Sequence, residues 1–337
     1  MIFTNEEKNH FLEYKLHQAK LLKIPDSLGV LDEIAKKVYV LKYRKNMINA
    51  RSILFIADNG VAQENVSAIS LKTEHKVFKE IGLGKAPINI ISEENKAPLK
   101  VYDVGSSLPS DPSSICDLRV AHSTKNIFLS NAMSERQFYR CFESGKKVAR
   151  SYKKDNALNI FILGEMGIGN TTVISIINSL ILGLPIDEIY DIGSGSDSTE
   201  MNKKKEIIDK CIKKFENIYG KFSKKNLVEL LCMFGSFELV ADVGFLIEAV
   251  GQNDLIIVDG AITMTAVLIA SFFLSNIDNN IIFSHLSSEK CAKKILDFFN
   301  REAALNLGMR MGQATGAGLF YSILRPVLRI HFESSLS

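Results

Sequence analysis

The sequence has few cysteines, and they are widely spaced. The five are Cys116, Cys141, Cys211, Cys232 and Cys291. Their number is odd and no CxxC pair occurs, which argues against a disulfide framework and against the usual zinc ligand sets. We therefore expect reduced, buried thiols in a cytoplasmic protein that holds no zinc.

Long apolar runs are also missing. The longest covers residues 261–274 and is interrupted by Thr263, Thr265 and Ser271, whereas a membrane-spanning helix needs roughly 18 or more apolar residues. The first residues do not show the basic-then-apolar order of a signal peptide. We interpret residues 261–274 as a buried helix of a protein that does not enter the membrane.

The sequence has no strong charge imbalance either. It contains 41 Lys and Arg against 38 Asp and Glu, a formal net charge of +3 among 337 residues. This surplus is too small to predict binding to nucleic acid or to an anionic membrane, so any anion must bind locally. Hydrophobic residues make up 46% of the chain, which is typical of a folded globular protein.

Short continuous apolar runs are the main structural signal of the chain. They cover residues 52–57, 99–104, 158–163, 255–258 and 281–283, and each is followed by Asp, Gly or Ser. Such runs between helical segments favour parallel strands that are covered on both faces. We predict an α/β protein with three α/β/α layers and a mainly parallel, Rossmann-like sheet over residues 50–300. Residues 1–49 and 301–337 are expected to form a small helical lobe.

A glycine-rich loop follows the third of these runs. It reads Gly-Glu-Met-Gly-Ile-Gly-Asn-Thr-Thr over residues 164–172 and leads into an apolar helical pattern. Backbone N–H groups at a helix start attract anions, so this loop is typical of a phosphate site. It is not a Walker A loop, because no lysine precedes the threonines. The alternative is a tight turn with an ordinary helix cap.

Several segments in order resemble one enzyme family, the nicotinate-nucleotide:dimethylbenzimidazole phosphoribosyltransferases of cobalamin nucleotide-loop assembly. The glycine-rich loop resembles the family signature, and the resemblance extends over most of the chain from about residue 53. The other segments that carry it are residues 56–61, 66–68, 101–105, 193–197, 235–238, 258–265, 284–289 and 308–317.

The resemblance implies an activity and a set of site residues. Family enzymes move the phosphoribosyl group of nicotinate mononucleotide to a benzimidazole nitrogen and release nicotinate, without a metal or another cofactor. The resemblance implies a homodimer, or a heterodimer with a paralogue. The residues that it places at the nucleotide are Gly167, Gly169, Asn170, Thr171, Gly193, Gly195, Lys204 and Asp259.

The acceptor side of the expected site departs from the family pattern. Gln313 stands where the family has its proton-accepting glutamate, and an amide cannot take a proton at neutral pH. Asp58 is followed by asparagine instead of histidine, and Leu71 replaces a glutamine. Both are expected near the acceptor. Glu165, inside the glycine-rich loop, and Asp58 are the candidates to replace the missing base.

Three functions fit these residues. The chain is a phosphoribosyltransferase with an altered acceptor, a catalytically weakened subunit that pairs with an intact relative, or a nucleotide-binding protein without transfer activity. His285, which follows the last apolar run, is a weaker candidate base, since a single histidine at a strand end is more often structural.

Overall fold

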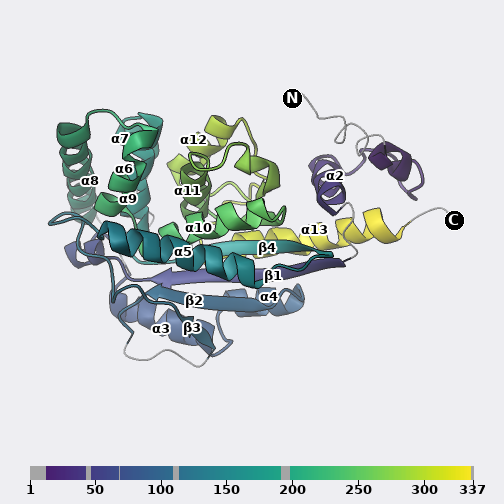
Figure 1. Cartoon of the computed structure of the whole chain (residues 1–337), viewed down its shortest axis with the longest axis horizontal. Helices are drawn as coiled ribbons and strands as arrows, with labels where there is room; N and C mark the ends of the chain where they lie inside the picture. The colour runs from purple at the N-terminus through teal and green to yellow at the C-terminus, as the bar shows by residue number, and fades with distance from the viewer. Residues whose placement is uncertain (1–12, 43–46, 68, 109–113, 191–197, 335–337) are drawn as a thin grey trace.

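The computed structural model describes residues 13–42, 47–67, 69–108, 114–190 and 198–334. Its centre is a six-stranded sheet in the order β3-β2-β1-β4-β5-β6 (Figure 1). Every pairing in it is parallel. The strands are β1 (Met47–Ala57), β2 (Leu99–Gly105), β3 (Ile115–Asp117), β4 (Ala157–Met166), β5 (Leu255–Val258) and β6 (Ile281–Phe283). The predicted α/β fold with a parallel sheet is confirmed.

Helices cover both faces of the sheet because successive strand residues point to opposite sides. Ile53 and Phe55 of β1 belong to one core, whereas Leu54 and Ile56 belong to the other. The first core is shared with α5 (Glu135–Ser151), α6 (Asn170–Leu182), α7 (Ile186–Ile189), α8 (Ser198–Tyr219), α9 (Leu227–Phe234), α10 (Phe237–Gly251), α11 (Ala261–Ala270) and α12 (Lys290–Phe299). The second is shared with α2 (Val30–Lys42), α3 (Leu71–Gly82), α4 (Pro87–Glu94) and α13 (Thr315–Glu333). Figure 1 shows α5 and α3 on opposite sides of the sheet.

The predicted buried helix within residues 261–274 is α11. All ten of its residues are buried, since it packs against α10, α12 and α6. No helix in the described ranges is long and apolar enough to cross a membrane. The prediction that the cysteine side chains are buried holds for four of them and is wrong for Cys116, which is exposed. Cys116 lies in β3, the short edge strand, where only one neighbouring strand covers it.

The two ends of the chain pack together through α2 and α13. Ile34 and Val38 of α2 share a core with Phe320 and Leu324 of α13, and strand residues complete this core. These helices therefore cover the sheet as well as each other. The division into a helical lobe and a larger domain stays a prediction.

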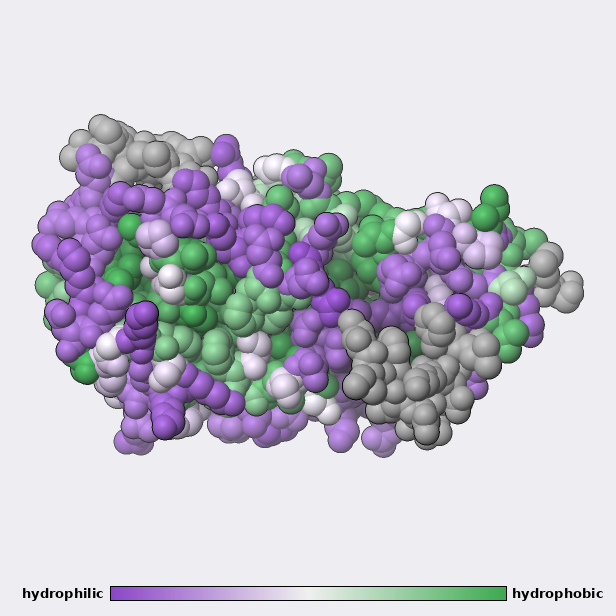
Figure 2. Space-filling model, turned by 90° about the horizontal axis from the view of Figure 1, so that it is seen from above, coloured by the Kyte–Doolittle hydropathy of each residue, from purple (hydrophilic) through white to green (hydrophobic). Residues whose placement is uncertain are grey.

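The lysines at residues 203–205 and 224–225 lie mostly at the surface. Figure 2 shows hydrophilic residues crowded at the left end of one face, the end where α8 lies, and apolar residues exposed toward the middle. Lys203 and Lys205 of α8 form surface ion pairs with Glu64 and Asp187. Lys204, between them, points inward instead.

Candidate active site

A pocket lies beyond the carboxyl ends of the strands. The strand order reverses between β1 and β4, which is where ligands bind in sheets of this kind. The pocket has a volume of about 260 Å³. Its wall comprises Ser67, Ile69, Glu74, residues 165–171, residues 259–262, His285, Ser287, Glu289 and residues 310–313. Polar residues at the ends of β4, β5 and β6 therefore meet in one cavity.

The glycine-rich loop forms one wall of this pocket and leads directly into α6. Glycine is needed at residue 167, because a Cβ there would lie 2.5 Å from Glu238 Oε1. It is also needed at residue 169, whose φ is +89°. Within the described part of the chain, the N–H groups of Gly169 and Thr171 donate to no other group. Two donors and a helix N-terminus are thus available to an anion.

Lys204 joins the loop from α8. Its Nζ donates to Thr171 Oγ1 at 2.8 Å and lies 5.1 Å from the centre of the Tyr190 ring. Burial lowers the pKa of Lys204 to about 8, and a bound phosphate would favour the charged form. The structure therefore brings Lys204 together with Gly167, Gly169, Asn170 and Thr171. Gly193 and Gly195 lie outside the described residues.

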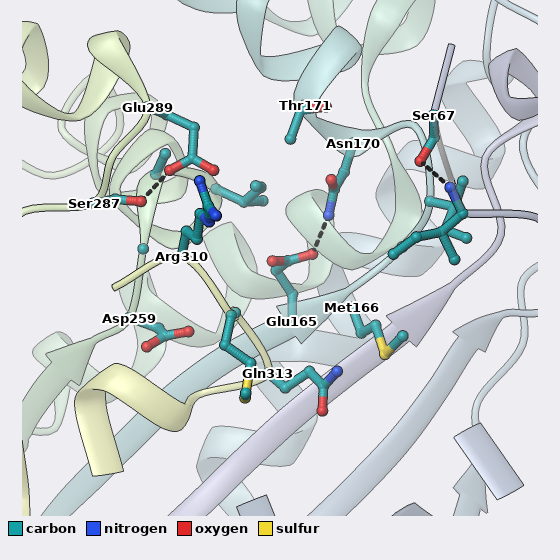
Figure 3. A pocket seen from close by; sticks show the side chains of 18 of the residues that line it. Ser67, Glu165, Met166, Asn170, Thr171, Asp259, Ser287, Glu289, Arg310 and Gln313 are labelled. Carbon is teal, nitrogen blue, oxygen red and sulfur yellow. Dashed lines mark hydrogen bonds between the residues drawn. The ribbon is translucent and has the colours of Figure 1, made fainter. Parts of the chain in front are cut away.

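Glu165 occupies the middle of the pocket (Figure 3). It is 7% exposed, and its Oε2 accepts a hydrogen bond of 2.6 Å from Asn170 Nδ2. Burial, together with the nearby acids Glu238 and Asp259, raises the pKa of Glu165 well above its ordinary value. A carboxyl whose pKa is raised in this way is a stronger proton acceptor once it has ionised.

Gln313 enters the pocket from a strained segment before α13. Gly312, Gln313 and Ala314 have φ values of 73°, 59° and 61°, a left-handed conformation that costs energy in the two residues with a Cβ. The segment packs against β4, since a Cβ on Gly164 would lie 2.3 Å from Ala314 N. Gln313 Oε1 is buried and has no hydrogen-bond partner among the described residues. This carbonyl oxygen is therefore an unpaired, buried acceptor in a residue that lines the pocket.

Two of the residues expected at the acceptor do not reach the pocket wall. Asp58 Oδ2 lies 2.9 Å from His75 Nε2, and it accepts hydrogen bonds from the N–H (2.8 Å) and the hydroxyl of Ser107. Leu71 begins α3 and is also absent from the wall. The Oδ2 atom of Asp58 is thus engaged by protein groups, and Asp58 does not line the cavity.

Asp259 and His285 do line the pocket, but both have structural partners. Asp259 Oδ1 accepts a hydrogen bond of 2.9 Å from Ala317 N and so holds the first turn of α13. His285 Nδ1 lies 2.9 Å from Ser284 Oγ and 3.9 Å from Asp259 Oδ1. In the ranges that the structure describes, no group of His, Cys, Asp and Glu could hold a metal ion.

A family model described as phosphoribosyltransferase matches residues 5–336 of the chain. The chain belongs to this phosphoribosyltransferase family. It is 30% identical over 306 residues to the nicotinate-nucleotide–dimethylbenzimidazole phosphoribosyltransferase of Clostridium acetobutylicum, covering 90% of this chain and 85% of that protein. It is 29% identical over 314 residues to the enzyme of the same name from Bacteroides fragilis, covering 92% and 89%. The crystal structure of CobT from Thermus thermophilus superimposes with a TM-score of 0.85 at 25% identity, covering 96% of each chain.

Two buried acids of this phosphoribosyltransferase were not identified as site residues from the sequence. Glu74 of α3 is fully buried in the pocket wall, and its Oε1 accepts a hydrogen bond from Ile168 N in the glycine-rich loop. Glu238 of α10 lies behind the loop and accepts a hydrogen bond of 2.9 Å from Asn59 Nδ2. No motif distinguishes Glu74 from the exposed acid Glu80 in the same helix, because only the position of the loop buries the former.

Proposed function

We propose that this phosphoribosyltransferase moves the phosphoribosyl group of nicotinate mononucleotide to a nitrogen of a benzimidazole-type acceptor. The products are nicotinate and a ribotide of the α-ribazole 5′-phosphate type, as used in cobalamin nucleotide-loop assembly. The relatives named above carry this activity in their names. The observation that carries the proposal is the glycine-rich loop, which lines a pocket with a central carboxyl and whose Gly169 and Thr171 N–H groups donate to no other described group.

The 5′-phosphate is assigned to the loop end of the pocket. Gly169 and Thr171 supply N–H donors, and α6 adds the positive end of its dipole. Lys204 supplies a full positive charge next to Thr171. Gly167 allows the phosphate and the ribose to approach the backbone closely. We place Gly193 and Gly195 beside the nucleotide on the resemblance alone.

The transfer itself needs orientation and one proton acceptor. The bond between the sugar carbon and nicotinate breaks, and its electron pair returns to the nicotinate ring. The attacking nitrogen forms the new bond from the opposite face, through a sugar with oxocarbenium character. Holding both rings in line lowers the barrier, and the acceptor's other ring nitrogen must lose its proton.

We assign that proton to Glu165. Its carboxyl lies in the middle of the pocket, whereas Asp58 is engaged by His75 and Ser107 outside the wall. The positively charged nicotinate ring of the bound substrate favours the ionised form of Glu165. Gln313, which the resemblance places at the position of the family's glutamate, lines the same pocket and orients the acceptor without taking its proton.

A comparison of two variants tests this assignment. Purified protein is incubated with nicotinate mononucleotide and a panel of benzimidazoles and phenols, and nicotinate release is measured. Glu165→Gln should lower kcat by about 10²–10⁴-fold, the usual contribution of a general base. Asp58→Asn is the matched control and should retain most of the turnover. If instead Asp58→Asn lost turnover and Glu165→Gln retained it, the proton acceptor would be Asp58.

The alternative function is nucleotide binding without transfer, alone or as a weakened subunit of a heterodimer. Gln313 is the residue that favours it, because it removes the family's proton acceptor. Calorimetric binding of nicotinate mononucleotide without release of nicotinate would support a binding protein. Release of nicotinate that begins only after addition of a second family member would support a weakened subunit of a heterodimer.

A further inference from the structure

Positive charge is concentrated at the carboxyl end of α8 and in the turn that follows it. Residues 210–225 contain six lysines and a single acid, Glu216. The whole chain has a net charge of only +3, so the remainder of the sequence is net negative. Hydrophilic residues crowd the end of the molecule where α8 lies (Figure 2). A surface on which one sign of charge is gathered in this way attracts partners of the opposite sign.

Five of these six lysines form no ion pair within the described ranges. They are Lys213, Lys214, Lys221, Lys224 and Lys225. We call these residues the basic patch. Lys210, by contrast, pairs with Glu206 at 2.5 Å. Lys214 is half-buried and the other four are exposed, so the charge of the basic patch is not neutralised by the protein itself.

The turn that carries the basic patch is packed against the core. α8 ends just before Gly220, whose φ of 70° turns the chain toward the short helix η2 (Lys224–Asn226). Between them, the ring of Phe222 packs edge-to-face on Phe272, with the ring centres 5.4 Å apart. The lysines are therefore presented in a defined arrangement, on a turn that the core holds in place.

Exposed apolar side chains lie among these lysines. Ile218 and Tyr219, the last residues of α8, are 60% and 40% exposed. Ile218 is four residues beyond Lys214 and so lies on the same stripe of the helix. Tyr219 and Lys225 line one cavity together with Tyr139, which is also exposed. A single exposed apolar residue needs no explanation, but lysines interleaved with aliphatic and aromatic side chains are typical of surfaces that bind at a membrane interface.

We infer that the basic patch docks the protein on the surface of a membrane that contains anionic lipids. The lysine ammonium groups contact the lipid phosphates, and Ile218 and Tyr219 enter the boundary between headgroups and hydrocarbon. Docking of this kind needs no membrane-spanning helix. A nucleic acid would match the charge equally well, but its phosphate backbone offers no apolar surface to Ile218. A lipid surface fits both the charge and the exposed apolar residues.

Binding of the whole protein to lipid vesicles tests this docking. Vesicles of phosphatidylcholine are compared by co-sedimentation with vesicles in which about one third of the lipid is phosphatidylglycerol. Each lysine close to an anionic surface contributes about fivefold to the affinity. We therefore expect binding to the anionic vesicles to be at least about 100-fold stronger, and to be lost at about 0.5 M KCl, where salt screens the charges.

Two triple variants separate the basic patch from the net charge of the protein. The first changes three lysines of the patch, Lys213→Gln, Lys214→Gln and Lys221→Gln. The second changes three exposed lysines of α3, on the opposite side of the sheet, Lys72→Gln, Lys76→Gln and Lys79→Gln. The first should weaken binding to anionic vesicles about 100-fold, and the second by less than about threefold. Both should unfold at the same urea concentration as the wild type, because none of the six lysines forms an ion pair within the described residues.

A single apolar substitution tests the lipid against other anionic partners. Ile218→Ser keeps every charge and should weaken vesicle binding about 5- to 10-fold, the contribution of one apolar side chain that leaves water. Equal weakening by the two triple variants would mean that net charge alone acts, and would overturn the inference. The same holds if the wild type does not prefer anionic vesicles. Binding to a short RNA without binding to vesicles would assign the basic patch to nucleic acid instead.

Discussion

Glu165 combines a central place in the pocket with an environment that opposes its ionisation. Burial and the acids Glu238 and Asp259 raise the pKa of Glu165 well above its ordinary value. Because the carboxyl must lose its proton before it can accept one, the rate should increase with pH. We expect kcat/KM for nicotinate mononucleotide to rise about tenfold per pH unit on the acid limb, up to that raised pKa. Nicotinate release measured from pH 5 to 9 checks this, and an acid limb near the ordinary pKa of glutamate would contradict it.

Gln313 offers a second test at the scale of one residue. Its Oε1 is buried and has no hydrogen-bond partner in the part of the chain that the structure describes. Gln313→Glu should raise turnover with dimethylbenzimidazole about 10-fold, since a carboxylate there can share the work of a general base. Initial rates of the variant and the wild type at pH 7.5 make the comparison. An unchanged rate would show that the amide at residue 313 does not limit the reaction.

Single residues were the hardest part of the site to predict from sequence. The loop residues and Lys204 are brought together as expected, because a strand, a turn and a helix fix the loop locally. Asp58 does not line the cavity, and its Oδ2 is engaged by Ser107 and His75, residues that lie far from it in the sequence. Glu74 looks like any acid in an amphipathic helix. Long-range packing decides both cases, and no local pattern encodes it.

At the scale of elements, the junction between β4 and α6 is the feature that forms the proposed phosphate site. Gly169 at the start of α6 and Gly183 at its end both have positive φ, +89° and +64°. A Cβ on Gly169 would lie 2.8 Å from Val61 Cγ1, whereas a Cβ on Gly183 meets nothing within 4 Å. The two ends of one helix therefore provide a matched pair of substitutions.

Alanine at these two glycines should affect stability and binding differently. Both variants should lose about 1 kcal/mol of unfolding free energy from the left-handed backbone. Gly169→Ala should also weaken binding of nicotinate mononucleotide by about 10-fold or more, because the loop must shift. Urea unfolding and calorimetry measure the two effects. Equal affinity in both variants would contradict the placement of the phosphate at this loop.

The elements themselves could largely be predicted from the sequence. The runs at 255–258 and 281–283 coincide with β5 and β6, because strands buried on both faces are apolar throughout. β1 and β4 are longer than predicted, since their partly polar ends still pair with each other. β3 was missed, as only three residues at the sheet edge pair there. Such short edge strands carry too few residues for a pattern.

At the scale of the whole molecule, a buried ionic contact joins the two ends of the chain. Asp32 Oδ1 lies 2.8 Å from Lys23 Nζ and 2.7 Å from Nε2 of His331 in α13. Burial acts to raise the pKa of Asp32, but the hydrogen bonds from Lys23, Leu28 N and His331 outweigh this effect and lower the pKa. The carboxylate is therefore charged and fully paired in the folded protein.

Loss of this carboxylate should destabilise the protein as a whole. Asp32→Ala leaves Lys23 and His331 buried without their partner, and should lower the free energy of unfolding by about 3 kcal/mol. Glu33→Ala, in the same helix, removes an exposed acid whose ion pair with Lys36 spans 3.9 Å, and should change it by less than about 0.5 kcal/mol. Urea unfolding compares the two. Similar changes in the free energy of unfolding of the two variants would show that the Asp32 contact contributes little to stability.

The most direct test of the proposed reaction is the identity and amount of the products. The protein is incubated with nicotinate mononucleotide and dimethylbenzimidazole, and the mixture is analysed by mass spectrometry against a reaction without acceptor. We predict one ribotide of the acceptor for each nicotinate released, and little release when the acceptor is omitted. Release of nicotinate that does not depend on an acceptor, with ribose phosphate as the other product, would contradict phosphoribosyl transfer.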